Sequence, residues 1–139
     1  MSAALLIDTG PLVAFLNRRD HHHSWAIAVM GELRPPFVTC EAVLSEACFL
    51  LRHTAGGAEA ILALVERELV AVRFAADAEI PALRRLLARY ADVPMSFADA
   101  CLVRMSELNS TCRLLSLDHD FRRYRRNGRQ AIPLIAPAL

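Results

Sequence analysis

The feature that most restricts the fold is a short, unbroken apolar run near the start of the chain, ALLID at residues 4–8. A continuous apolar run of this length, ended by the turn sequence Thr-Gly-Pro, is typical of a strand buried on both faces. Such strands occur almost only in parallel sheets that helices cover on each side. The run therefore predicts an α/β fold, and it leaves open why an acidic residue ends it.

The rest of the chain alternates short β-type runs with longer helical ones. Further strands are predicted at 36–40, 70–74, 113–117 and 131–135, with helices at 11–18, 21–33, 41–52, 56–69, 77–90 and 96–108 and a turn leading to a short helix at 118–126. Strands that alternate with helices favour one α/β domain over residues 1–139. Its central sheet is expected to be mostly parallel, with four to five strands flanked by helices.

The composition excludes several classes of protein. With 55% hydrophobic residues and a net charge of +1 in 139 residues, the chain is not disordered, and its overall charge argues neither for nor against nucleic acid. No apolar run approaches the roughly 20 residues of a membrane-spanning helix, and the N-terminus lacks a basic signal region. The cysteines form no C-x-x-C pair, which favours structural thiols in a reducing cytoplasm: Cys40, Cys48, Cys101 and Cys112. We therefore expect a soluble, cytoplasmic protein.

Two acidic residues come directly after predicted strands. Asp8 ends the first strand, and Asp118 follows the strand at 113–117. Ligands of open α/β sheets bind outside the carboxyl ends of the strands, where both acids would then lie. The structural alternative is that Asp8 caps the next helix and Asp118 caps the one near His119, a role for which Asp120 competes.

Glu46 lies within the predicted helix at 41–52. It comes three residues after Val43 and four before Leu50, so we expect it on the apolar stripe of this helix. A buried carboxylate without a partner costs several kcal/mol, so Glu46 would need a partner or a metal ion. The alternative is a glutamate at the rim of the core, paired with an arginine.

Asp99 combines two signals. With Ser96 it has the spacing of a capping box, in which an acid sits at the third position of a helix. It also precedes Leu102 and Val103 by three and four residues, so its side of the helix is apolar. The N-terminus of a helix favours a negative charge there.

Together the four acids predict a metal site. Three or four carboxylates at one sheet edge would repel one another and raise each other's pKa values, and a divalent cation removes that conflict. Oxygen ligands without neighbouring His or Cys favour Mg²⁺ or Mn²⁺ over zinc. Such a site suits the hydrolysis of phosphodiester bonds, in which the metal positions a phosphate oxygen and activates water.

The segments around these acids resemble the acidic motifs of PIN-domain ribonucleases, and the likeness extends to the small VapC-like toxins of type II toxin–antitoxin systems. The motifs occur in the order of the family and cover essentially the whole chain: LLIDTGPLVAFL at Asp8, VLSEACFLL at Glu46, MSFADACLVRMSE at Asp99 and LLSLDHDF at Asp118. The resemblance implies a PIN-like three-layer sandwich with the first strand central. It also implies Mg²⁺- or Mn²⁺-dependent endonucleolytic cleavage of RNA.

The resemblance also implies a role for each acid. Asp8 and Asp99 would be the main metal ligands, and Asp118 a further ligand acting through a water. Glu46 would complete the catalytic cluster by orienting metal or water, and Ser116 matches a small hydroxyl residue that often precedes the last acid. Such toxins usually dimerise and bind a small antitoxin, so the expected partners are RNA, a cognate antitoxin and a second copy of the chain, without a membrane.

A basic segment, FRRYRRNGR at 121–129, follows the last acid. Arginines beside aromatic residues are suited to holding an RNA backbone and stacking on bases, which makes these candidate RNA-binding residues: Arg122, Arg123, Arg125 and Arg126. The alternatives are a solvated helix face or an edge that meets the antitoxin. The apolar helix at 56–69 is a second candidate partner surface.

Other functions remain as alternatives or are poor fits. The chain contains no lysine, which argues against a Walker-type phosphate loop and against phosphatases and receiver domains. The DHHHSW segment at 20–25 is better explained as a helix start capped by Asp20 than as a metal site. An RNA-processing nuclease without an antitoxin and a catalytically silent binding module both stay open. Metal titration separates the silent module from the nucleases.

Overall fold

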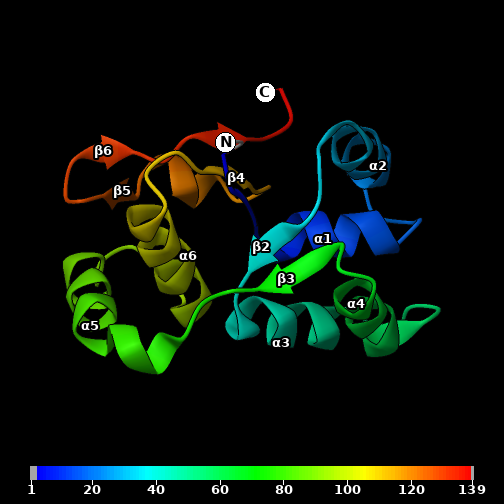
Figure 1. Cartoon of the computed structure of the whole chain (residues 1–139), viewed down its shortest axis with the longest axis horizontal. Helices are drawn as coiled ribbons and strands as arrows, with labels where there is room; N and C mark the ends of the chain where they lie inside the picture. Colours follow the sequence, from blue (N-terminus) through cyan, green and yellow to red (C-terminus); the bar gives the residue numbers. More distant parts are fainter. Residues whose placement is uncertain (1–2, 139) are drawn as a thin grey trace.

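Five short strands form one parallel sheet at the centre of the molecule (Figure 1). This computed structural model describes residues 3–138, and residues 1, 2 and 139 lie outside the described part. The sheet has the order β3-β2-β1-β4-β7, and all neighbouring strands are parallel. Its strands are β1 (Leu5–Ile7), β2 (Phe37–Thr39), β3 (Val70–Val72), β4 (Arg113–Leu115) and β7 (Leu134–Ile135). The predicted parallel sheet with a central first strand is confirmed.

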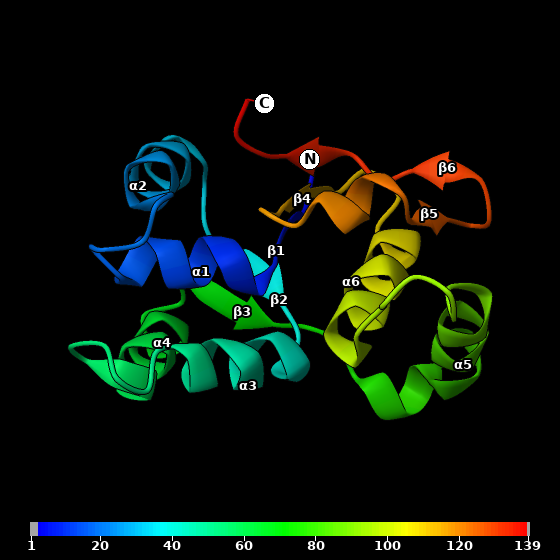
Figure 2. The ribbon, with the colours of Figure 1, turned by 180° about the vertical axis from the view of Figure 1, so that it is seen from behind.

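Within the described residues, six α-helices flank the sheet. They are α1 (Thr9–Leu16), α2 (His23–Glu32), α3 (Glu41–Leu50), α4 (Gly57–Glu66), α5 (Ile80–Arg89) and α6 (Phe97–Leu108). In Figure 1 the strands lie between α5 and α6 on the left and α1, α2 and α4 on the right, and Figure 2 shows the same arrangement from behind. The molecule therefore has the three layers that the family resemblance implies. No helix within residues 3–138 has both the length and the hydropathy that a membrane span requires.

The core explains why the strands are so short and so apolar. Every residue of β1 is buried, because β2 and β4 cover its two edges and helices cover its faces. Thr39 donates a side-chain hydrogen bond of 2.9 Å to the carbonyl oxygen of Ile7, which ties the carboxyl ends of β2 and β1 together. All four cysteines are free thiols, as expected, and three of them are buried.

The C-terminal part differs from the prediction. The segment at 118–126 contains a single 3₁₀ turn, η2 (His119–Arg122), followed by a strand, β5 (Arg125–Arg126), that pairs with β6 (Gln130–Ala131) in an antiparallel ribbon. Asn127 and Gly128 turn the chain between them with positive φ angles of 52° and 83°, the conformation that an Asn-Gly pair favours. The predicted strand at 131–135 is split into β6 and β7, because Pro133 between them has no N–H to donate.

Helices α3 and α4 pack against each other and leave an apolar patch exposed. The patch consists of Phe49, Leu50 and Leu62, which are 61%, 51% and 57% exposed. Leu62 lies on the helix at 56–69, for which a partner surface is predicted, and Phe49 and Leu50 lie on α3. Binding of a partner there stays a prediction.

Candidate active site

Asp8 is buried at the carboxyl end of β1, with only 6% of its surface exposed. Its Oδ1 accepts a hydrogen bond of 2.7 Å from the Thr9 amide and caps α1, and its Oδ2 accepts one of 2.9 Å from the Ser116 hydroxyl. Burial raises the pKa of Asp8 to about 7, although these two hydrogen bonds lower it; the charges of Asp99 and Asp118 raise it further. Asp8 thus caps α1, and its burial makes the ionised form of its carboxyl group unfavourable.

Asp99 is buried at the start of α6 and is 8% exposed. The predicted capping box is present: the Asp99 amide donates to the Ser96 hydroxyl at 3.0 Å, and Asp99 Oδ2 accepts from the Ser96 amide at 3.2 Å. The same Oδ2 accepts a hydrogen bond of 3.2 Å from the Tyr124 hydroxyl. Burial raises the pKa of Asp99, and the charge of Asp118 adds to the effect. The hydrogen bonds to Asp99 from described residues all end on Oδ2, which leaves Oδ1 for an external ligand.

Asp118 lies beyond the end of β4, where it is exposed and caps η2. Its amide donates a hydrogen bond of 3.0 Å to the Ser116 hydroxyl, so Ser116 joins Asp118 to Asp8. The charge of Asp118 raises the pKa of both Asp8 and Asp99, whereas Asp120 pairs with Arg123. This supports Asp118, rather than Asp120, as the fourth acid of the site.

The prediction that Glu46 lies on the buried stripe of α3 is wrong, because Glu46 and Leu50 are both exposed. The buried stripe of α3 continues from Val43 and Ala47 to Leu51 at intervals of four residues. Glu46 lies at the edge of that stripe. It still reaches the site from there, since its Oε2 accepts a hydrogen bond of 3.2 Å from the Thr9 hydroxyl, and Thr9 also binds Asp8.

Hydrogen bonds through Thr9 and Ser116 connect Asp8 with Glu46 and Asp118, and Asp99 is close enough for its charge to act on Asp8. Within residues 3–138, however, no three His, Cys, Asp or Glu side chains are spaced to hold a metal ion by themselves. Mg²⁺ usually binds through one or two carboxylates and keeps several waters, and Asp8 with the free oxygen of Asp99 offers such a donor set. The residues therefore fit a hard divalent cation with a largely hydrated shell. The direct or water-mediated role of Asp118 stays a prediction.

Sequence reasoning missed the role of Tyr124, and its expectation for the aromatics of the basic segment is wrong. Phe121 and Tyr124 are fully buried, so they cannot stack on RNA bases. Their rings pack edge to face, and Tyr90 packs on Tyr124 in the same manner. Burial raises the pKa of Tyr124, as does the nearby charge of Asp99, so its hydroxyl stays protonated and donates to Asp99. The only signal in the sequence is the spacing of the two aromatics, three residues apart within the basic run.

The four candidate RNA-binding arginines lie in different surroundings. Arg126 is half-buried and donates to the Ser106 carbonyl at 3.3 Å, and Arg125 donates to the carbonyls of the preceding residues. Arg123 pairs with Asp120 at 3.4 Å. Arg122 is exposed and lines a cavity beside Asp118. RNA contact by these residues stays a prediction, with Arg122 the best placed of them.

The histidine segment does not begin a helix in the predicted way. The first residue of α2 is His23, and Asp20 accepts a hydrogen bond of 2.8 Å from the His22 amide in the turn before it. Asp20 therefore shapes that turn and does not cap α2. The ring of His23 lies 2.7 Å from the Ala14 carbonyl oxygen, which directs it to α1 and away from a shared metal.

Ser96→Ala is expected to lower the free energy of unfolding by about 1 kcal/mol, because the Asp99 amide loses its capping partner. Urea denaturation followed by circular dichroism measures the change. Ser24→Ala on the exposed side of α2 is the matched control. Equal stability of the Ser96 and Ser24 variants would contradict the role of the capping box.

Comparisons with known proteins agree with this fold. A family model described as PIN domain matches residues 5–127. Among solved structures, the crystal structure of VapC20 from Mycobacterium tuberculosis, described as a sarcin–ricin loop cleaving toxin, has 27% sequence identity and a TM-score of 0.70. The similarity covers 84% of this chain and 92% of that one. Curated protein sequences give no match to the chain.

Proposed function

This chain belongs to the PIN-domain family, and we propose that it is a metal-dependent endoribonuclease that serves as the toxin of a toxin–antitoxin pair. The observation that carries the proposal is the pair of buried carboxylates, Asp8 and Asp99, whose charges interact at the carboxyl edge of the sheet. Two buried acids with raised pKa values are costly to keep ionised unless a cation joins them. The similarity to an RNA-cleaving toxin supports RNA as the substrate.

We propose Mg²⁺ or Mn²⁺ as the ion, held by Asp8 and Asp99, with Asp118 acting through a water. When bound, the ion would supply positive charge that lowers the pKa of a water molecule and stabilises the negative charge that builds on the phosphate. PIN nucleases in general depend on divalent metal ions, and the all-carboxylate donor set of this chain favours a hard cation over zinc.

The protein groups around the ion would position the reactants. Tyr124 and Ser116 fix the orientation of Asp99 and Asp8 through their hydroxyl groups. Glu46 is exposed and has one hydrogen bond, from Thr9, so its carboxylate can accept a proton from the attacking water. Hydrolysis adds this water to the phosphorus atom and breaks the bond to the 3′-oxygen. The products are a 5′-phosphate and a 3′-hydroxyl end.

The proposed partners follow from the same assignment. The whole chain, 1–139, is proposed to be a single PIN-type domain, because β7 beyond the matched region completes the same sheet. A cognate antitoxin and a second copy of the chain are the proposed protein partners. The apolar patch of Phe49, Leu50 and Leu62 is a candidate surface for one of them. The cytoplasm, where ribosomal and transfer RNA are found, is the proposed location.

The purified protein is expected to cut single-stranded RNA in Mg²⁺ or Mn²⁺ and to lose this activity when EDTA removes the metal. Adding the metal back in excess should restore the original rate, because the apolar core and not the ion holds the fold together. Gel electrophoresis of an end-labelled random-sequence RNA pool measures the cleavage. Asp8→Asn, carried through the same additions, controls for a contaminating ribonuclease.

Two results would contradict the proposal. Cleavage that is unchanged in EDTA would exclude a metal-dependent nuclease. Absence of cleavage together with absence of Mn²⁺ binding in a calorimetric titration would leave the silent binding module as the better explanation. The toxin role is tested separately: induction of the wild type should arrest growth, and induction of Asp8→Asn should not.

A further inference from the structure

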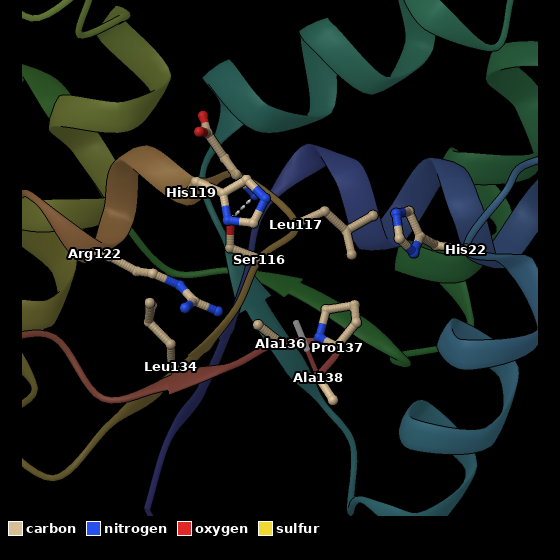
Figure 3. A pocket seen from close by; sticks show the side chains of 10 residues that line it. His22, Ser116, Leu117, His119, Arg122, Leu134, Ala136, Pro137 and Ala138 are labelled. Carbon is tan, nitrogen blue, oxygen red and sulfur yellow. Dashed lines mark hydrogen bonds between the residues drawn. The ribbon is translucent and has the colours of Figure 1, made fainter.

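A cavity lies directly beside the acidic site, where β4 and β7 end. Its volume is about 150 Å³, and it is lined from three parts of the chain: the turn before α2, the β4–η2 connection and the segment after β7. Figure 3 shows Arg122 and His22 on opposite sides of this cavity, with Leu117 and Pro137 between them. Of the four predicted catalytic acids only Asp118 lines this space.

The lining combines apolar walls with flat, polar side chains. Leu117, Leu134 and Pro137 supply apolar surface, while His22, His119 and Arg122 supply planar groups that can stack and donate hydrogen bonds. Imidazole and guanidinium planes are the groups on which proteins stack unpaired RNA bases. The cavity thus has the chemistry of a site for one aromatic heterocycle.

The charge of Asp118 distinguishes a base from a phosphate as the occupant. Asp118 lines the cavity together with Arg122, so a phosphate in this space would face a carboxylate. A neutral base gains from the same group, because its exocyclic amino group can donate to a carboxylate oxygen. The observations therefore favour a base.

The size of the cavity limits the occupant further. At about 150 Å³ it lies below the roughly 300 Å³ at which pockets for drug-sized ligands begin. The space therefore suits a small planar group such as one base.

Ser116 and Asp118 belong both to this cavity and to the acidic site. We propose that the cavity binds one unstacked nucleobase of the RNA substrate, next to the phosphodiester that is cut. The proposal rests on the proposed function and adds a binding site to it. Through this site, Arg122 and His22 would help to position the RNA and determine where it is cut.

The test compares the wild type with a variant whose cavity is filled, and it measures how the removal of single bases from the substrate affects cleavage. A synthetic oligoribonucleotide with one known cut, chosen from the products of the random-sequence pool, is made with an abasic nucleotide at each of several positions around the cut. In the wild type, one position is expected to be sensitive: its abasic form should lower kcat/KM about 10-fold or more, on the scale of one stacked base. In Ala136→Phe the larger side chain enters the cavity, so kcat/KM for the intact RNA should fall by a similar factor.

The decisive readout is the abasic penalty in each variant, which is the factor by which an abasic nucleotide lowers kcat/KM. In Ala136→Phe the penalty at the sensitive position should disappear, while the profile at other positions stays the same. Arg122→Ala removes an exposed side chain without touching the core, and it should reduce the penalty at the same position. Ala28→Phe and Arg67→Ala, both exposed and outside the cavity, are matched controls that should keep the wild-type profile.

Each other outcome counts against the inference in a recognisable way. A wild type with no sensitive position, or a filled variant that keeps the full penalty, overturns the base site while the nuclease assignment stands. A uniform loss of rate with an unchanged abasic profile shows a general disturbance of the site and also overturns it. A wild type that cuts no RNA in Mg²⁺ or Mn²⁺ refutes the proposed function, and the base site with it.

Discussion

Asp99→Asn is expected to lower the rate of RNA cleavage by about 10³-fold, the scale of losing one group that acts on charge in a transition state. The amide keeps the shape of the side chain, and its oxygen can still accept from Ser96 and Tyr124, so the capping box should survive. What is lost is the negative charge that would hold the metal ion. Single-turnover cleavage of the labelled oligoribonucleotide in Mg²⁺ measures the loss.

The control is Asp92→Asn, which changes an exposed acid in the loop before α6 and should leave the rate unchanged. Far-UV circular dichroism of both variants should match the wild type. Cleavage by Asp99→Asn at the wild-type rate, with the fold intact, would mean that the acids at this sheet edge are structural and that the site lies elsewhere.

The metal-free protein is expected to lose stability as the pH rises from 4 to 8. The pKa of Asp8 is near its ordinary value in the unfolded chain and about 7 in the folded protein, so the folded state binds a proton more tightly. A raised folded-state pKa contributes stability that is fully present below the unfolded pKa and is lost as the pH passes through the folded one. Three pKa units correspond to about 4 kcal/mol, and the raised pKa of Asp99 acts in the same direction.

Asp8→Asn isolates this effect, because asparagine does not ionise. In EDTA the variant should be about as stable as the wild type at pH 4 and more stable by several kcal/mol at pH 8, as measured by urea denaturation. Adding Mn²⁺ at pH 8 should stabilise the wild type and not the variant. A wild type that is at least as stable as Asp8→Asn at pH 8 in EDTA would show that the burial of Asp8 carries no such cost.

The parts of the fold that local pattern predicts best are those in which each residue is buried by its immediate neighbours. The apolar residues of the run at 4–8 form the central strand β1 because burial removes them from water, and the Thr-Gly-Pro turn after the run starts α1 with Asp8 as its cap. The ribbon of β5 and β6 was missed because Arg125, Arg126 and Gln130 are polar and show no alternation that predicts a strand. Its pairing depends on the Asn127–Gly128 turn and on contact with α6.

The candidate site likewise contains residues that local pattern predicts and residues that only tertiary packing determines. Asp8 and Asp99 stand out in sequence because an acid in an apolar run is costly to bury, and both prove to be buried. The position of Glu46 depends on which of two adjacent leucines, Leu50 or Leu51, faces the core, and a period of 3.6 residues does not decide between them. The bond of Tyr124 to Asp99 joins two segments 25 residues apart, so it follows from tertiary packing and from no local pattern.

The hydrogen bond between Ser116 and Asp8 spans 108 positions of the chain. Protein synthesis adds about 5–20 residues each second, so Asp8 is made at least about 5 s before its partner. Until β4 has been synthesised, β1 has an open edge and Asp8 lacks both the Ser116 hydroxyl and the neighbouring charge of Asp118. The acidic site is therefore incomplete until the chain has been synthesised as far as Asp118, so the last residues of the site to be made are the ones that link its two strand ends.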